Sequence, residues 1–221
     1  MIGIVIGTGD WTGVACTAAR RMMQMTGLSM EVITEVDPKF THPSWMKSAI
    51  LDWPQFASED SFLVMDADII CLQEWEPDAL FETLGRPFCA VPEPNTDTVH
   101  DECASLGIPF PSYYVNAGLT MFGREHAEVW NIVKRKHPKC GRWLEQGALN
   151  LALMHTGVEV CRLPRRFNVV TYRGDVERYH DEQMRGHAIN LHITSMPGPQ
   201  ELRQIQESYG LRSAPESIAT D

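Results

Sequence analysis

Two aspartates spaced one residue apart follow an apolar run, and this combination can bind a metal ion. The apolar residues 62–65 lead directly into Asp66 and Asp68. Residues two apart project to the same side of extended backbone, so both carboxylates can approach one hard cation and a diphosphate bound to it. The alternative is a turn at the end of a strand, in which the two Asp side chains cap the backbone.

A glycine-containing turn near the N-terminus is a second candidate for ligand binding. The apolar residues 2–7 are followed by Thr8, Gly9 and Asp10. A short turn of this kind after a strand can hold a nucleotide. However, the full Gly-x-Gly-x-x-Gly fingerprint of dinucleotide-binding folds is absent, which disfavours hydride transfer.

The composition predicts one soluble domain. At 221 residues and 43% hydrophobic residues, the chain can bury a single substantial core. We expect one domain over residues 1–210 and a loosely ordered C-terminal tail over residues 211–221. No apolar run reaches the roughly 18 residues of a membrane span, and no signal peptide begins the chain, so we expect a soluble cytoplasmic protein. The six cysteines lack a Cys-x-x-Cys pair and are expected to be reduced core thiols.

The charge distribution limits the choice of partners. The net charge is -10, and the acidic excess lies in the first 100 residues. A pI near 5.2 argues against non-specific nucleic-acid binding, which depends on Lys and Arg. Basic clusters remain at residues 134–136 with Arg142, and at Arg162, Arg165 and Arg166. They are either a solvated helix end and loop or a site for a polyanion.

Alternating hydrophobic patterns predict an α/β fold. Strands are expected over residues 2–7, 30–34, 62–66, 87–91, 113–122, 158–163 and 187–194, the fifth interrupted at residues 116–118. Helices are expected over residues 14–25, from Pro43, and over residues 124–136, 143–155 and 199–209. Residues 92–111 are expected to form a long loop, either a lid or an acceptor loop. This order predicts a mostly parallel central sheet flanked by helices, with ligands at the carboxyl ends of the strands.

Four segments in this order resemble the glycogenin-like, retaining glycosyltransferases of the GT-A fold, over roughly residues 2–195. The first contains Ser44-Trp45-Met46-Lys47 and leads through Asp66-Ala67-Asp68 to Leu80-Phe81. The others are Val115-Asn116-Ala117-Gly118, Glu145-Gln146-Gly147-Ala148-Leu149-Asn150 and Ile189-Asn190-Leu191-His192. The resemblance implies a single GT-A (Rossmann-like) domain that uses a nucleotide sugar and a manganese ion.

The resemblance also implies a metal site. Asp66, Asp68 and His192 would ligate the metal together with the diphosphate of the donor. Two carboxylates and one imidazole suit Mn²⁺ better than Mg²⁺, which is the alternative. Taken alone, His192 is typical of a histidine with a structural hydrogen bond.

Further residues acquire roles from the same resemblance. The nucleotide sugar would be held by Gly7, Thr8, Asp10, Trp11, Lys47, Asp66, Ala67, Asp68, Asn116, Ala117, Gly118 and Gln146. The groups nearest the anomeric carbon would be Asn116, Glu145 and Gln146. Structural alternatives are a core Trp11, a solvated Lys47, an Asn116 bonded within its strand, and an exposed helix turn at Glu145 and Gln146.

Two departures from the family pattern concern charged residues. The family commonly has a lysine shortly after its late histidine, whereas this chain reads Ile193-Thr194-Ser195-Met196-Pro197-Gly198-Pro199. The lysine that would bind the diphosphate is missing, and Arg165, Arg166 or Arg173 are its candidate replacements. Glu145 stands where the family commonly has an aspartate.

Together these observations predict a metal-dependent transferase that moves a hexose from a UDP-sugar to a hydroxyl acceptor with retention of anomeric configuration. The acceptor is a saccharide, a protein or a hydroxylated (for example hydroxymethylated) base in DNA, and the oligomeric state is left open. One alternative is a catalytically idle nucleotide-sugar-binding protein. Another is a metal-dependent nucleotidyltransferase, although the chain lacks the expected Gly-rich, basic phosphate loop.

Overall fold

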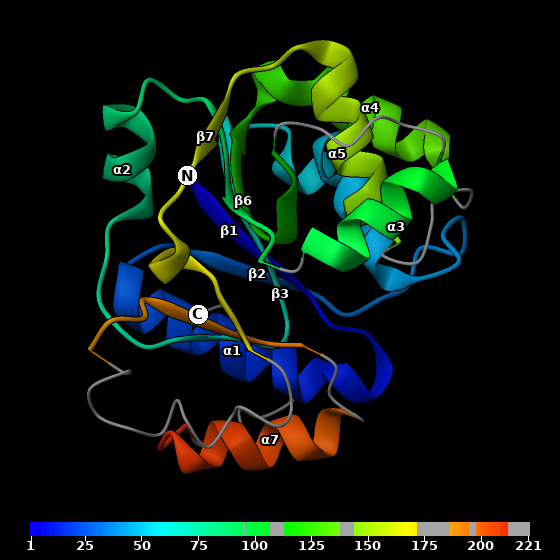
Figure 1. Cartoon of the computed structure of the whole chain (residues 1–221). Helices are drawn as coiled ribbons and strands as arrows, with labels where there is room; N and C mark the ends of the chain where they lie inside the picture. Colours follow the sequence, from blue (N-terminus) through cyan, green and yellow to red (C-terminus); the bar gives the residue numbers. More distant parts are fainter. Residues whose placement is uncertain (95, 107–112, 138–143, 172–185, 195–197, 212–221) are drawn as a thin grey trace.

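A six-stranded sheet forms the centre of the protein (Figure 1). The computed structural model describes residues 1–94, 96–106, 113–137, 144–171, 186–194 and 198–211. In spatial order the strands are β2 (Met30–Ile33), β1 (Ile2–Ile6), β3 (Ser61–Asp66), β6 (Val115–Gly123), β5 (Phe88–Pro92) and β7 (Val160–Arg162). Only β6 runs against its neighbours among these strands, so the expected mostly parallel sheet is confirmed.

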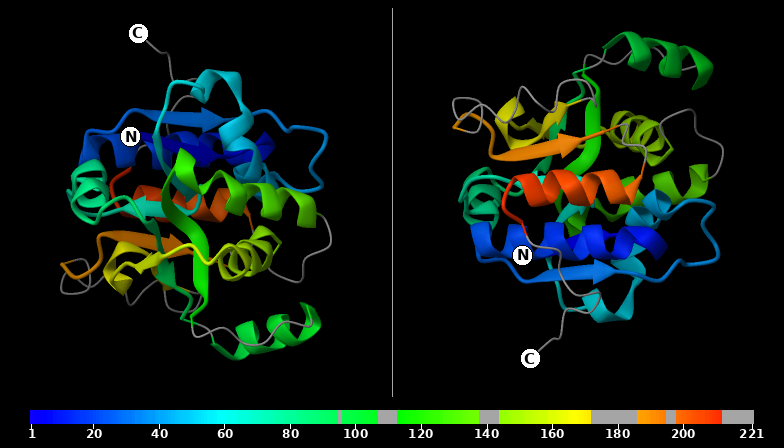
Figure 2. Two further views of the ribbon diagram at one scale, coloured as in Figure 1. Left: turned by 90° about the horizontal axis from the view of Figure 1, so that it is seen from above. Right: turned by 90° about the horizontal axis from the view of Figure 1, so that it is seen from below.

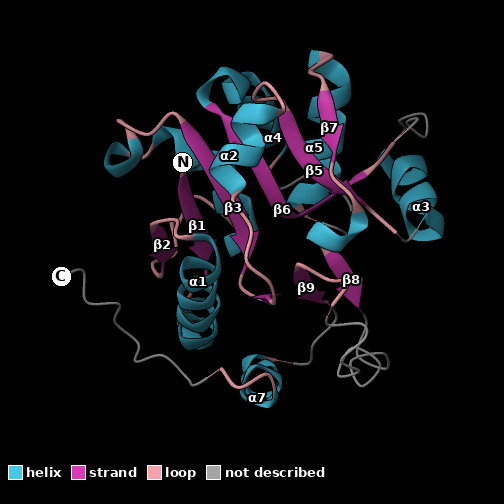
Figure 3. Cartoon of the chain, turned by 90° about the vertical axis from the view of Figure 1, so that its left-hand side faces the viewer, coloured by secondary structure: helices cyan, strands magenta, loops and turns pink. Residues whose placement is uncertain are grey.

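A second sheet of three short strands lies beside the first (Figure 3). Its order is β4 (Ile69–Cys71), β9 (Asn190–Ile193) and β8 (Val169–Thr171). Strand β9 pairs antiparallel with β4, and this register places His192 opposite Ile69. Because Ile69 directly follows Asp68, the pairing brings the late histidine next to the aspartate pair.

Helices cover both faces of the central sheet, as the views in Figures 2 and 3 show. One face carries the helices α1 (Thr12–Thr26), α2 (Pro77–Thr83) and α7 (Pro199–Ser208). The other carries the 3-10 helix η2 (Pro43–Asp52) and the helices α4 (Ala127–Lys136) and α5 (Glu145–Thr156). The other helical elements of the described residues are α3 (Thr96–Leu106) and the 3-10 turns η1 (Gly9–Trp11), η3 (Pro54–Phe56), η4 (Arg124–His126) and η5 (Arg165–Phe167).

The two hydrophobic cores follow from the alternation of side chains along the strands. Successive strand residues point to opposite faces, so an all-apolar strand supplies both cores. In β1 and β3 the residues toward α1 are Val5, Leu63 and Met65, and those toward α4 and α5 are Ile4, Phe62 and Val64. The continuous apolar run before Asp66 is therefore a strand buried on both sides, which fixes the position of Asp66 at its carboxyl end.

The structure corrects one expectation and refines another. Strand β6 spans Val115–Gly123, but its pairing with β5 is irregular where the interruption was expected: Ala90 pairs with Thr120 and Pro92 with Val115, so the extra residues lie in β6 between these two pairs. The expected long loop over residues 92–111 contains α3. Val99 and Cys103, four residues apart in α3, pack together with Tyr114, a pattern that the sequence interpretation overlooked.

Several short elements were not expected from the sequence, and some expectations lie outside the described residues. Strands β4 and β8 have three residues each and helix α2 has seven, which is too short for a clear periodic pattern. The start of the expected helix at Trp143 and almost all of the expected tail, residues 212–221, lie outside the described residues. Among the described helices, none has the length and apolar character needed to cross a membrane.

Candidate metal and nucleotide-sugar site

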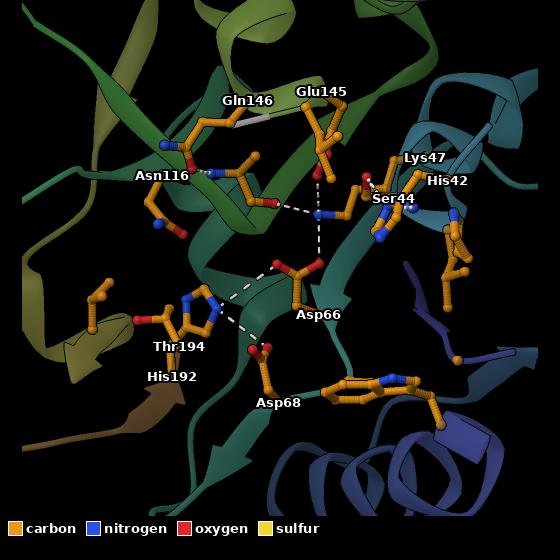
Figure 4. A pocket seen from close by; sticks show the side chains of 18 of the residues that line it. His42, Ser44, Lys47, Asp66, Asp68, Asn116, Glu145, Gln146, His192 and Thr194 are labelled. Atoms are coloured by element: carbon orange, nitrogen blue, oxygen red, sulfur yellow. Dashed lines mark hydrogen bonds and ion pairs between the residues drawn. The ribbon is translucent and has the colours of Figure 1, made fainter. Parts of the chain in front are cut away.

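A cavity of about 500 Å³ opens at the edge where the carboxyl ends of β1, β3 and β5 meet the amino end of β6 (Figure 4). Ligands of α/β sheets bind at this edge. Residues from eight elements and the loops beside them converge here. The sequence-derived residues that line the cavity are Gly7, Thr8, Trp11, Lys47, Asp66, Ala67, Asp68, Asn116, Ala117, Glu145, Gln146 and His192.

The three expected metal ligands form one cluster at the cavity wall. The ligand atoms of Asp66, Asp68 and His192 all lie within 4.8 Å of one another. His192 Nε2 lies 3.2 Å from Asp68 Oδ1 and 3.8 Å from Asp66 Oδ2. Both carboxylates and the imidazole therefore face one point, which is the arrangement that a divalent cation requires.

An unpaired polar atom supports this interpretation. Asp68 Oδ1 is buried and makes no hydrogen bond that meets the usual geometry within the described part of the chain, although His192 Nε2 lies 3.2 Å from it. A buried acceptor without a partner is costly, and a cation at this point would satisfy it. The residues present therefore fit a divalent metal.

Gly118 lies beneath the imidazole rather than at the cavity surface. A Cβ atom at this position would lie 2.2 Å from Cε1 and 2.7 Å from Nδ1 of His192. Gly118 therefore provides the space that the imidazole occupies. Gly118 therefore packs against His192, the expected metal ligand, and is not needed for a special backbone conformation.

Lys47 is a buried cation shared by two carboxylates. Its Nζ lies 2.5 Å from Asp66 Oδ1 and 2.7 Å from Glu145 Oε1, and it donates a hydrogen bond of 3.0 Å to the Ala117 carbonyl. The side chain is 2% exposed, so it is not the solvated helix lysine that was one alternative. All three protons of the ammonium group have a partner. Lys47 therefore joins η2, β3, β6 and α5 at the cavity wall.

Burial and charge shift the pKa values of this cluster. Burial opposes the charge of Lys47, but Asp66 and Glu145 outweigh it and raise the Lys47 pKa above its usual range. Burial raises the pKa of Asp66 to about 6, with Asp68 adding to the effect and Lys47 opposing it. Burial also opposes protonation of His192, but the charges of Asp68 and Asp66 outweigh it and raise the His192 pKa. A cation bound here would oppose protonation of Asp66 and His192, because it favours their proton-free forms.

A second network connects the groups expected to face the sugar. Asn116 Nδ2 donates to Glu93 Oε2 at 2.8 Å, and Gln146 Nε2 donates to the same oxygen at 3.3 Å. Gln146 Oε1 accepts from the Ala117 N–H at 2.9 Å, and Asn116 Oδ1 accepts from Gly118 N–H and Asn168 Nδ2. These side chains are held in fixed orientations at the cavity wall.

Glu93 was not among the expected site residues, yet it lines the cavity. A signal was present in the sequence, because Glu93 directly follows the buried strand β5. The carboxyl ends of β5 and β3 lie at the same edge of the sheet. Glu93 at the end of β5 is therefore an acidic residue in the same position as the aspartate pair at the end of β3, two strands away.

Other expected site residues lie elsewhere. Asp10 lines a separate polar cavity beside the first turn of α7, so its expected contact with the nucleotide remains a prediction. Arg165 and Arg166 belong to η5 and are not among the residues that line the first cavity. Arg142 and Arg173 lie outside the described residues. In the other basic cluster, Lys134 pairs with Asp52 and Arg135 with Glu128, as in an ordinary solvated helix end.

Solved structures of other proteins share the fold of this chain, although no sequence comparison found a match. No protein-family model and no curated protein sequence matched the chain. A glycosyltransferase involved in glycosylation of the major capsid of PBCV-1 matches with a TM-score of 0.64 and 14% identity, over 94% of this chain and 100% of that chain. Galactosyltransferase LgtC, crystallised with donor and acceptor sugar analogues, matches with a TM-score of 0.63 and 14% identity over 98% of each chain.

A third similar structure is mouse xyloside xylosyltransferase 1, with a TM-score of 0.54 and 12% identity over 88% of this chain and 97% of that chain. All three are glycosyltransferases, and they match nearly the whole length of the chain. At these identities the similarity concerns the fold. The protein therefore has the GT-A fold that the family resemblance implied.

Proposed function

We propose that this protein is a metal-dependent glycosyltransferase that moves a hexose from a UDP-sugar to a hydroxyl acceptor with retention of anomeric configuration. The observation that carries the proposal is the convergence of Asp66, Asp68 and His192 at the wall of a cavity in a GT-A fold. The ligands come from two different sheets, so their convergence is a property of the fold rather than of one turn.

Asp66, Asp68 and His192 would hold the metal, and Mn²⁺ suits this mixed oxygen and nitrogen ligand set. When bound, the metal supplies Lewis-acid stabilisation of the negative charge that develops on the departing diphosphate. Gly7, Thr8 and Trp11 lie at the end of β1 on the same cavity and are the proposed nucleotide contacts.

The remaining residues orient the reacting groups. Lys47 fixes the carboxylates of Asp66 and Glu145 by its ion pairs. Because Glu145 is buried and neutralised by Lys47, Glu93 is the carboxylate better placed to offset positive charge on the sugar ring. Asn116 and Gln146 position Glu93 by hydrogen bonds to one of its oxygens. An oxocarbenium-like sugar is stabilised by a nearby carboxylate.

The second candidate is a nucleotide-sugar-binding protein without transferase activity. The observation that favours it is the absence of a lysine between His192 and α7. Such a protein would bind the nucleotide sugar and metal but release no sugar. The two candidates therefore differ in turnover and not in binding.

The test measures thermal stability and donor hydrolysis with a panel of nucleotide sugars, each with and without Mn²⁺. A ligand at 100 times its dissociation constant should stabilise the protein by about 2.7 kcal/mol. We expect a UDP-sugar to stabilise the protein only with Mn²⁺ and to be hydrolysed slowly. Asp66→Asn should abolish both effects, whereas the exposed Asp52→Asn should retain them.

Three outcomes separate the alternatives. Metal-dependent binding without sugar release, even when saccharide, protein and hydroxymethylated DNA acceptors are supplied, favours the binding protein. A failure of every nucleotide sugar to stabilise the protein contradicts both candidates. Normal Mn²⁺-dependent turnover by Asp66→Asn contradicts the assignment of the metal ligands.

A further inference from the structure

Helix α7 follows one part of the cavity lining in the sequence and packs near another part of it. It begins at Pro199, a few residues after Thr194, which lines the first cavity and follows the strand that carries His192. The helix then runs alongside α1, as Figures 1 and 2 show. Near the start of α1 lies η1, whose Trp11 lines the same cavity.

Two polar side chains of α7 bind the backbone of this N-terminal segment. Arg203 Nη2 donates a hydrogen bond of 3.0 Å to the carbonyl oxygen of Asp10. One turn later, Gln206 Nε2 donates a hydrogen bond of 3.3 Å to the carbonyl oxygen of Val14. Gln206 is 2% exposed and Leu202 is fully buried, so this side of α7 is fixed in the core.

Arg203 of α7 approaches α1 closely because α1 has a glycine, Gly13, at the point of contact. A Cβ atom on Gly13 would lie 3.1 Å from Arg203 Nη2, tighter than an ordinary contact. On its other side the turn is fixed by Thr12, whose hydroxyl donates to the Gly7 carbonyl at 3.1 Å. The turn between Gly7 and Thr12 is therefore fixed by two contacts. The hydroxyl of Thr12 makes the local one, and Arg203 of α7 makes the one that is distant in sequence.

We propose that Arg203 is a positioning residue for nucleotide binding, which fixes η1 through the Asp10 carbonyl and so sets the position of Trp11 in the cavity. The nucleotide ligand in this inference rests on the proposed function, whereas the contact between Arg203 and the Asp10 carbonyl does not. Because Arg203 acts through the backbone of the turn, it affects the nucleoside half of the ligand and not the phosphates.

The test compares the affinities of uridine and UDP, with Mn²⁺ present, in wild type and Arg203→Ala. Loss of one charge-assisted hydrogen bond should lower the affinity for uridine and for UDP by the same factor, about tenfold. At saturating donor we expect kcat to stay close to that of wild type while KM for the donor rises. Arg203→Lys should recover part of the affinity, and the exposed neighbour Gln204→Ala, the matched control, should change neither ligand.

A second measurement does not depend on the proposed function. Hydrogen exchange of the ligand-free protein should be faster at residues 9–13 in Arg203→Ala than in wild type, and unchanged in Gln204→Ala. Unchanged exchange in Arg203→Ala overturns the inference. A loss of affinity for UDP but not for uridine also overturns it, because Arg203 would then act on the phosphates. If wild type binds neither ligand, the proposed function fails while hydrogen exchange still decides the role of Arg203.

Discussion

At the scale of single residues, the charge balance of the site depends on Lys47. This side chain is almost fully buried and is the shared cation of Asp66 and Glu145. Removing one partner of a buried ion pair leaves uncompensated charge, which costs more than the pair itself contributes. The same argument does not apply to the more exposed pair of Lys134 and Asp52.

We therefore expect Lys47→Met to lower the free energy of unfolding by about 3 kcal/mol. The control Lys134→Met, which breaks the more exposed pair, should cost less than about 1 kcal/mol. Urea unfolding of both variants without metal measures the difference. Equal stabilities of the two variants would show that Lys47 is not a structural cation.

His126 provides a test of pH dependence away from the site. It is 6% exposed, and its Nδ1 accepts a hydrogen bond of 3.1 Å from the Gly123 N–H. Burial lowers the pKa of His126 below its usual value of 6.5. The unfolded chain therefore binds a proton at a higher pH than the folded protein does, and stability is lost as the pH falls below about 6.5.

The expected result is a smaller loss of unfolding free energy between pH 7 and pH 5 in His126→Asn than in wild type. Urea unfolding at both pH values measures it, and the other titrating groups are common to the two proteins. Identical pH dependence in wild type and variant would contradict a neutral, buried His126.

At the scale of elements, the amino end of β6 shows how α5 builds the cavity wall. The side-chain amide of Asn150 bonds both backbone groups of Val115, at 2.8 and 2.9 Å. One turn earlier on α5, Gln146 accepts from the Ala117 N–H at 2.9 Å. The spacing of four residues places both amides on one face of the helix. Side chains of α5 thus satisfy backbone groups at the amino end of β6 that a neighbouring strand would otherwise bond.

The packing of β6 against β9 predicts the effect of a single methyl group. Gly118→Ala would place Cβ 2.2 Å from the His192 ring, so the ring or the strand must move. We expect at least a tenfold loss of Mn²⁺ affinity and a cost of about 1–3 kcal/mol in unfolding free energy from overpacking. Gly198→Ala is the control, because a Cβ there meets nothing within 4 Å.

Calorimetric titration with Mn²⁺ and urea unfolding separate the two effects. A folded Gly118→Ala variant with wild-type Mn²⁺ affinity would show that the position of the His192 ring does not determine metal binding.

At the scale of the whole molecule, the proposed metal site would connect the two sheets. Asp66 ends a strand of the central sheet, and His192 lies in the second sheet. A cation that binds both should stabilise the folded chain against separation of these sheets, because the unfolded chain cannot bring residues so distant in sequence to one point.

We expect Mn²⁺ at 100 times its dissociation constant to add about 2.7 kcal/mol to the free energy of unfolding, and a chelator to reverse the effect. His192→Asn should lose most of this gain, whereas His155→Asn, on the exposed end of α5, should retain it. Thermal unfolding with Mn²⁺ and with chelator measures the gain. A full gain in His192→Asn would exclude the imidazole as a ligand.

Much of this architecture was predictable because local patterns have local physical causes. A buried strand requires a continuous apolar run, and the residue that ends the run stands at the ligand-binding edge of a parallel sheet. The run before Asp66 therefore determined the position of the aspartate pair. The apolar residues of β1 and the periodic pattern of α1 determined the first strand, turn and helix in the same way.

Only the tertiary structure decided which distant groups meet. Whether Lys47 faces solvent or two carboxylates, and whether Glu93 faces the cavity, depends on the packing of η2, α5 and β5 around one edge. Likewise, no local pattern connects Arg203 to Asp10, because their contact exists only when α7 lies against α1. The sequence by itself determined the long buried strands, most of the helices and the place of the aspartate pair at the end of β3. The fold decided the partners of these residues, because burial and ion pairing depend on neighbours that are distant in the chain.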